Sequence, residues 1–191
     1  MSKSEQLKKI EEEAKKCKKC PLWKTRKNVV FGMGNPETKI LFIGEAPGYN
    51  EDLKGIPFCG KAGEVLDLLF SSISMKREDI YITNIIKCRP PGNRDPKEEE
   101  IEKCREYLEK QIEIINPEII CCLGRHALKY IFKKYSIENK KGISAIHGKV
   151  FEKRDIFSTI KIVAFYHPAV AVYNPEKLKV LKEDFKILKE I

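Results

Sequence analysis

Short apolar runs and helical stripes alternate along the chain. Runs bounded by polar residues and glycine are typical of buried β-strands. These runs are Lys39–Ile43 (KILFI), Ile80–Thr83 (IYIT) and Glu118–Leu123 (EIICCL). The stretch 148–165 (GKVFE, then TIKIVAF) predicts a β-hairpin.

Between these runs, apolar residues recur every three or four positions, which is the spacing of an amphipathic helix. Ser2 and Glu5 make a capping box for the first helix, and Asp95 before Pro96 predicts the N-cap of another. The apolar stripes are Leu7, Ile10, Ala14 and Cys17; Val65, Leu66, Leu69 and Phe70; Ile101, Cys104, Leu108 and Ile115; Leu128, Ile131 and Phe132; and Leu178, Leu181, Phe185 and Leu188. Alternating strands and helices predict a parallel sheet covered on both faces.

Length and composition narrow the class of protein. The 191 residues fit one domain, 1–191, and a hydrophobic content of 42% allows a folded core. No stretch reaches the roughly 18–20 apolar residues that a membrane span needs. The N-terminal segment is polar and unlike a secretory signal, so we expect a soluble, intracellular, cytoplasmic protein.

Lysine and arginine exceed the acidic residues, 37 against 28, and give a net charge of +9. Such an excess favours a polyanionic partner such as a nucleic acid. The same richness in charged residues is also typical of thermophile proteins that bind no nucleic acid. Charge alone therefore does not decide between these two interpretations.

Seven cysteines in a chain without a secretory signal favour metal, cluster or catalytic roles over disulfides. Cys17 and Cys20 form a C-x2-C pair, Cys88 follows a strand, and Cys104 lies on an apolar helix stripe. Four such thiolates suit Zn²⁺ or an iron–sulfur cluster, and the wide second spacing favours the cluster. The other three fit simpler roles, core packing for Cys121 and Cys122 and a loop position for Cys59.

Three polar motifs follow predicted strands. They are GEAPGYNED (44–52), NIIKCRPPGNRDP (84–96) and HPAV (167–170). Ligands of open α/β sheets bind beyond the carboxyl ends of the strands, so Glu45, Asn84 and His167 are expected to share one pocket. Taken singly, the motifs also fit a tight turn with solvated acids, a surface loop and a structural histidine.

These motifs, with PFCGKAG (57–63) and the four spaced cysteines, resemble the family 4 uracil-DNA glycosylases, iron–sulfur enzymes of thermophilic bacteria and archaea. The resemblance runs from Cys17 to the last helix. It implies an α/β fold, a three-layer α/β/α sandwich around a short, mainly parallel four-stranded central sheet. It also implies a structural 4Fe–4S cluster on Cys17, Cys20, Cys88 and Cys104.

The implied reaction is hydrolysis of the N-glycosidic bond of flipped-out deoxyuridine, releasing uracil and leaving an abasic site for base excision repair. By the resemblance, Asn84 reads uracil, Phe58 stacks on its ring, and His167 reaches O2. The backbone from Glu45 through Ala46 to Pro47 lines the pocket. Related families place the attacking water with an aspartate that this chain lacks, so Glu45, with Glu51 second, is the candidate here.

The implied partner is uracil-containing DNA, single- or double-stranded, bound by a monomer with possible repair or replication partners and no membrane. The turn Pro168, Ala169 and Val170 resembles a loop that enters the minor groove. The candidate phosphate contacts are Lys61, Lys87, Arg89 and Arg94. The chain departs from the family pattern at Tyr49, Asn50, Cys59 and Tyr173.

Two other functions remain open from the sequence. One is a non-catalytic iron–sulfur protein that binds nucleic acid or senses redox state. The other is a zinc-bound hydrolase, which would be colourless, whereas an iron–sulfur protein is brown.

Overall fold

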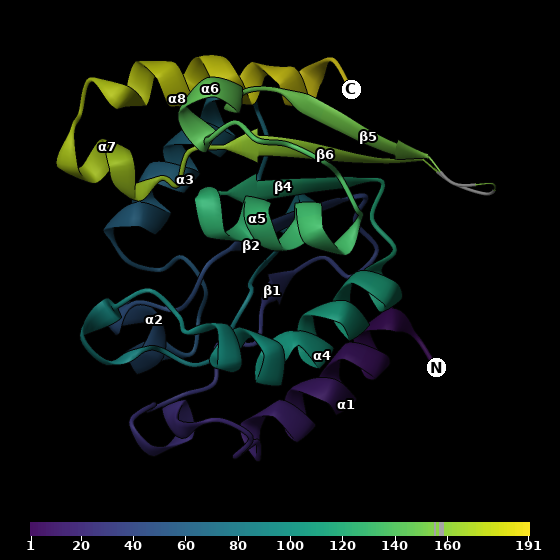
Figure 1. Cartoon of the computed structure of the whole chain (residues 1–191), viewed down its shortest axis with the longest axis vertical. Helices are drawn as coiled ribbons and strands as arrows, with labels where there is room; N and C mark the ends of the chain where they lie inside the picture. Colours follow the sequence, from purple (N-terminus) through teal and green to yellow (C-terminus); the bar gives the residue numbers. More distant parts are fainter. Residues whose placement is uncertain (155, 157–158) are drawn as a thin grey trace.

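The computed structural model describes residues 1–154, 156 and 159–191, within which six strands form one mixed sheet (Figure 1). The strand order is β1-β3-β2-β4-β6-β5. The four central strands are mutually parallel, and they are β3 (Tyr81–Asn84), β2 (Ile40–Gly44), β4 (Ile119–Leu123) and β6 (Thr159–Phe165). Residues 155, 157 and 158, in the turn of the predicted hairpin, lie outside the described residues.

The prediction of four strands is too low. Both edge strands are antiparallel to their neighbours: β1 (Met33–Gly34) pairs with β3, and β5 (Val150–Arg154) pairs with β6 as the predicted hairpin. A strand of two residues is too short to show a hydrophobic periodicity, so the sequence pattern did not predict β1. The mainly parallel centre of the sheet is as predicted.

Helices cover both faces of the sheet, which gives three layers. One face carries α1 (Lys3–Lys15), α4 (Glu98–Ile115) and α5 (Arg125–Lys134). The other carries α3 (Lys61–Ser72), α7 (Ala169–Tyr173) and α8 (Lys177–Phe185). The other helices are α2 (Tyr49–Lys54) and α6 (Ile143–Ile146), and single 3₁₀ turns lie at Pro21–Lys24, Arg77–Asp79, Pro91–Asn93 and Lys186–Lys189 among the described residues.

Alternation along the strands builds the two cores. In β2, Leu41 and Ile43 pack under α1, α4 and α5, whereas Phe42 packs under α3 and α8. All three side chains are fully buried, as expected for parallel strands covered on both faces. Because the central strands are parallel, their carboxyl ends lie at a common edge of the sheet, and the polar motifs lie at this edge.

Two helix starts test the capping predictions. Ser2 and Glu5 form the predicted capping box of α1. The prediction for Asp95 is wrong, because α4 begins at Glu98 with Lys97 as its N-cap residue. The Lys97 N–H donates to Glu100, while Asp95 is drawn away into contacts with Arg125 and His126 of α5.

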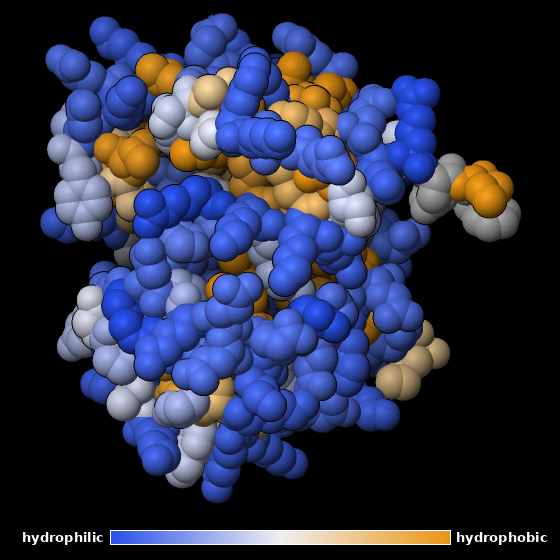
Figure 2. Space-filling view, in the orientation of Figure 1, coloured by the Kyte–Doolittle hydropathy of each residue, from blue (hydrophilic) through white to orange (hydrophobic). Residues whose placement is uncertain are grey.

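The viewed face is mostly hydrophilic, and apolar residues show mainly in its upper half (Figure 2). This surface agrees with the high content of charged residues in the sequence. Among the described residues, none of the helices combines the length and the apolar character that crossing a membrane would require.

Candidate active site and four-cysteine site

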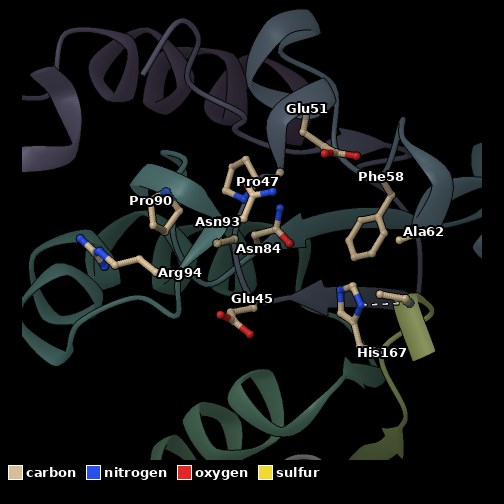
Figure 3. A pocket seen from close by; sticks show the side chains of 13 residues that line it. Glu45, Pro47, Glu51, Phe58, Ala62, Asn84, Pro90, Asn93, Arg94 and His167 are labelled. Atoms are coloured by element: carbon tan, nitrogen blue, oxygen red, sulfur yellow. Dashed lines mark hydrogen bonds between the residues drawn. The ribbon is translucent and has the colours of Figure 1, made fainter. Parts of the chain in front are cut away.

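A cavity of about 310 Å³ opens at the carboxyl ends of β2, β3 and β6 (Figure 3). The structure brings Asn84, Phe58 and His167 together in its wall, with Asn84 facing the other two across the space. The remaining lining residues are Glu45, Ala46, Pro47, Gly48, Glu51, Ala62, Pro90, Asn93, Arg94 and Ala169. Side chains from distant motifs therefore share one site, as the strand order predicts.

Asn84 is the last residue of β3 and is 2% exposed. Its side-chain oxygen Oδ1 is buried and has no hydrogen-bond partner among the described residues. Buried polar atoms are nearly always paired, so an unpaired acceptor facing a cavity indicates a missing donor. The site is therefore built to receive an N–H group at this atom.

Phe58 lies in the loop before α3, and close contacts hold its ring in place. Its φ is +50°, a conformation that non-glycine residues rarely adopt. Arg77 donates to the carbonyls of Pro57 (3.2 Å) and Phe58 (2.6 Å), which secures this strained turn. A Cβ at Gly63 would lie 1.8 Å from the Phe58 carbonyl oxygen, so only glycine fits there.

His167 follows β6, and its ring centroid lies 5.6 Å from that of Phe58. The backbone N–H of Ala169 donates to His167 Nδ1 at 3.2 Å. Burial lowers the pKa of His167 to about 4, so the ring is neutral at pH 7. Because Nδ1 accepts a hydrogen bond, Nε2 carries the proton and is available as a neutral donor.

Two carboxylates line the cavity and differ in their environments. Glu51 Oε1 accepts from the N–H groups of Cys59 (3.0 Å) and Gly60 (2.9 Å), which fixes the loop that carries Phe58. Glu45, just after β2, points away from Phe58 and His167 (Figure 3). Burial raises the pKa of Glu45, His126 opposes the rise, and Asp95 adds to it.

The structure contradicts one predicted phosphate contact. Lys87 is 1% exposed, so its ammonium cannot reach a DNA backbone. Its Nζ donates to Thr83 Oγ1 (2.6 Å), the Asn84 carbonyl (2.7 Å) and Gln111 Oε1 (2.6 Å). Burial lowers the pKa of Lys87 to about 7. The loop pattern suggested a surface cation because the sequence does not show that this side chain turns inward.

The other predicted DNA contacts lie at or near the cavity mouth. Lys61 is exposed at the start of α3, and Arg89 stacks over the ring of Tyr49 at 5.0 Å. Arg94 lines the cavity but makes a two-pronged ion pair with buried Glu100 (2.9 and 2.6 Å). In the turn after His167, Pro168 is buried, and Ala169 and Val170, which begin α7, are partly exposed.

Cys17, Cys20, Cys88 and Cys104 surround a second, smaller pocket between α1, α4 and the loop after β3. Cys59, Cys121 and Cys122 lie elsewhere, the last two fully buried in β4. The helices that carry the site pack side by side, with Lys3 Nζ donating to the Ile115 carbonyl at 2.8 Å. The four predicted thiols are therefore gathered by the packing of α1 on α4.

The spacing of these sulfurs distinguishes among metal centres. Four thiolates around one Zn²⁺ lie about 3.8 Å apart, given Zn–S bonds of about 2.3 Å. Among the described residues, only Glu45, Asp95 and His126 form a group of three or more candidate metal ligands whose atoms all lie within 4.8 Å of one another. The sulfur atoms of the four cysteines are therefore farther apart than this limit allows for such a group. A larger iron–sulfur cluster fits this spread better than one zinc ion.

The groups around the four cysteines also suit an anionic metal cluster with sulfur ligands. Arg26 Nη1 donates to Cys88 Sγ at 3.2 Å, and the Lys87 N–H donates to Cys104 Sγ at 3.4 Å. Burial raises the pKa of Cys104 to about 12, so a bare thiolate there is unfavourable without a bound metal centre. The donor set and its N–H···S contacts therefore fit such a cluster.

Sequence reasoning missed several residues that build the site. Gly63 and Arg77 hold Phe58, Asn93 lines the cavity, and His126 faces Glu45. Gly63 lies in the quoted PFCGKAG motif, so its glycine was a usable signal. Asn93 lies in the quoted NIIKCRPPGNRDP motif, whereas Arg77 and His126 carry no local pattern that distinguishes them from surface residues.

This fold and its two sites define a class: an α/β protein with a cavity that suits one flat, polar-edged ring and with four cysteines around a second pocket. A family model described as the uracil DNA glycosylase superfamily matches residues 31–189. The chain belongs to this superfamily.

Individual relatives are similar in sequence to this chain over nearly its whole length. A type-4 uracil-DNA glycosylase of Archaeoglobus fulgidus is 48% identical over 187 residues, which cover 98% of this chain and 94% of the relative. The type-4 enzyme of Saccharolobus solfataricus is 50% identical over 95% of this chain and 84% of its own length. That of Thermotoga maritima is 42% identical over 93% and 90%.

Proposed function

We propose that this protein is a monofunctional uracil-DNA glycosylase that excises uracil in base excision repair. It hydrolyses the N-glycosidic bond of a flipped-out deoxyuridine and leaves an abasic site. The observation that carries the proposal is the unpaired, buried Asn84 Oδ1, which faces Phe58 and His167 across one cavity.

Asn84 suits uracil by its hydrogen-bonding pattern. Its Oδ1 accepts from N3–H of uracil, and its Nδ2 donates to O4. Cytosine offers an unprotonated N3 and an amino group at these positions, so both contacts would be lost. Leaving buried polar groups unpaired costs about 1–3 kcal/mol each, which supports strong discrimination at this site. The Phe58 ring supplies the stacking surface.

His167 stabilises the leaving group. As the C1′–N1 bond breaks, the electron pair stays on uracil, and negative charge develops at O2. A neutral Nε2–H aimed at O2 stabilises that charge as it forms. Because the pKa of His167 is depressed to about 4, the ring remains neutral down to mildly acidic pH.

Glu45 acts on the sugar side of the bond. The deoxyribose becomes cation-like, and a water molecule adds to C1′ while its proton passes to the carboxylate or to solvent. An ionised carboxylate at this place stabilises the cation and orients the water. Glu51 is less suited, since its Oε1 already accepts two backbone N–H groups.

DNA contacts are proposed from the rim of the cavity. Flipping a nucleotide costs a few kcal/mol of unstacking, and Ala169 and Val170, backed by buried Pro168, fill the vacated space from the minor groove. Lys61, Arg89 and Arg94 are the proposed phosphate contacts. A single domain over residues 1–191, the monomeric state, and binding to single- or double-stranded DNA remain predictions, as do any repair or replication partners.

Cys17, Cys20, Cys88 and Cys104 would hold a 4Fe–4S cluster. When bound, the cluster supplies structural cross-linking of α1, α4 and the loop after β3, and no step of the reaction passes through it. None of the described residues that line the substrate cavity is a lysine. We therefore expect base release without strand cleavage before alkali treatment.

The decisive experiment measures uracil release from U·G, U·A and single-stranded substrates. Asn84→Ala should lower kcat/KM by about 100-fold or more, because it removes a buried specificity contact. Lys61→Ala, the control, removes one screened surface charge and should lower it only a few-fold. A wild-type protein that binds DNA but releases no uracil would instead support the non-catalytic alternative.

A further inference from the structure

A compact charged cluster lies beside the cavity at the place where Glu45 points. Glu45 follows β2, Asp95 lies in the loop before α4, and His126 is in the first turn of α5. Their ligand atoms all lie within 4.8 Å of one another. His126 Nε2 is 3.2 Å from Asp95 Oδ2 and 3.7 Å from Glu45 Oε2.

The backbone and a neighbouring cation fix this cluster. The Ile86 N–H donates to the Glu45 carbonyl at 3.2 Å, so the Glu45 backbone is anchored on the segment just after β3. Arg125 Nη2 donates to Asp95 Oδ2 at 2.9 Å, and Arg125 Nε donates to His126 Nε2 at 3.0 Å. A guanidinium thus already sits among these groups, which favours an ion-pair network over a metal site.

We propose that His126 is a positioning residue for uracil excision: its imidazole, held between Arg125 and Asp95, keeps the Glu45 carboxylate on the sugar side of the cavity. This inference rests on the proposed function and assigns the group that prepares Glu45. His126 is separated from the other site residues in sequence, and only the packing of α5 beside β2 and β4 brings it there.

The charges around Glu45 act in opposite directions. Burial raises the pKa of its carboxyl group, His126 and Arg125 of α5 lower it, and Asp95 raises it. A protonated Glu45 cannot stabilise a cation-like sugar, so activity falls at acidic pH as this group takes up a proton. Removing positive charge should therefore move the acidic limb to higher pH, and removing the Asp95 charge should move it to lower pH.

The experiment is the pH dependence of kcat/KM on a single-stranded uracil oligonucleotide. In His126→Gln the acidic limb should move up by roughly 0.5–1 pH unit, the low end for an opposite charge about 4–6 Å away. A small shift is expected because the Glu45 and His126 side chains are 26% and 24% exposed. In Asp95→Asn, which retains a hydrogen-bond acceptor, the limb should move down by a similar amount.

Two further variants make the result specific. Glu45→Gln should abolish this limb and lower the plateau. Lys39→Gln removes one positive charge just before β2, at the opposite end of that strand, where Lys39 pairs with Glu118 at 2.8 Å. It should leave the limb unmoved, since both of these side chains are well exposed and distant from the cavity.

The outcomes separate this inference from the proposed function. If wild-type protein releases no uracil, the proposed function fails. If it releases uracil but both His126→Gln and Asp95→Asn keep the wild-type limb, or move it in the same direction, the role of His126 is wrong. A limb that persists in Glu45→Gln overturns it too. If one variant does not fold, the direction of the shift in the other decides.

Discussion

At the scale of single residues, the site depends on Gly44, which has no Cβ atom. A Cβ at Gly44 would lie 2.4 Å from Asn84 Oδ1 and 2.7 Å from Phe58 Cζ. Real Cβ atoms do not approach other atoms so closely, so an alanine there must displace the amide or the ring. The glycine thus lets a specificity group and a stacking ring meet at the end of β2.

Gly44→Ala should therefore lower single-turnover uracil excision by about 100-fold, the loss that a misplacement of about 1 Å can produce. Unfolding midpoints should change little, because the strain falls on cavity side chains. The control is Gly142→Ala, where a Cβ meets nothing within 4 Å, and it should keep wild-type activity. Full activity in Gly44→Ala would show that neither Asn84 nor Phe58 needs this close approach.

At the scale of elements, the end of β3 is tied to α4 by a buried amine. Lys87 Nζ satisfies its three donors on Thr83, the Asn84 carbonyl and Gln111. Gln111 Nε2 in turn donates to the Phe31 carbonyl at 2.9 Å. The turn that aims Asn84 is thereby held by a hydrogen-bonded network between sheet and helix.

Lys87→Met keeps the length of the side chain and removes all three donors. The free energy of unfolding should fall by about 1–3 kcal/mol, and KM should rise more than kcat falls, because Asn84 loses its support. Denaturant melts and steady-state kinetics would measure both effects. Lys61→Met, on the exposed start of α3, should leave stability unchanged. Equal stability of the two variants would mean that the network contributes nothing.

At the scale of the whole molecule, the four-cysteine site joins the N-terminal helix to the body. The ion pairs that accompany it are surface contacts, such as Lys110 with Glu13 at 3.7 Å, and such pairs contribute little. A bound cluster would therefore be the main restraint on α1 beyond its apolar face. Its loss should loosen α1 and the loop after β3 together.

Cys17→Ser should lower the free energy of unfolding by more than about 2 kcal/mol and weaken DNA binding, with a smaller effect on the single-turnover rate at saturating enzyme. Visible absorbance, iron content and thermal melts measure the cluster and its effect on stability. Cys59→Ser, a thiol outside the group, should keep colour and stability. If Cys17→Ser folds and binds DNA normally yet cannot cleave, the structural role is wrong.

The sequence by itself determined the central sheet and the set of motifs at its edge. Apolar runs are followed by Gly44-Glu45, Asn84 and His167, which places these residues at the carboxyl ends of parallel strands, where those ends meet at one edge. Helical spacing similarly placed Cys104 on the inward face of α4, whereas Cys17 lies just beyond the end of α1, contrary to the prediction. The inferences that succeeded depend on local periodicity and on general rules of strand connection.

Only the tertiary structure decided what depends on distances between remote segments. In the folded chain Lys87 points inward, Asp95 contacts α5 instead of capping α4, and His126 lies beside Glu45. A lysine in a basic loop and a histidine in a helix have no local signature of these contacts. Their roles follow from packing between layers, where burial and neighbouring charge are set by residues far away in the chain.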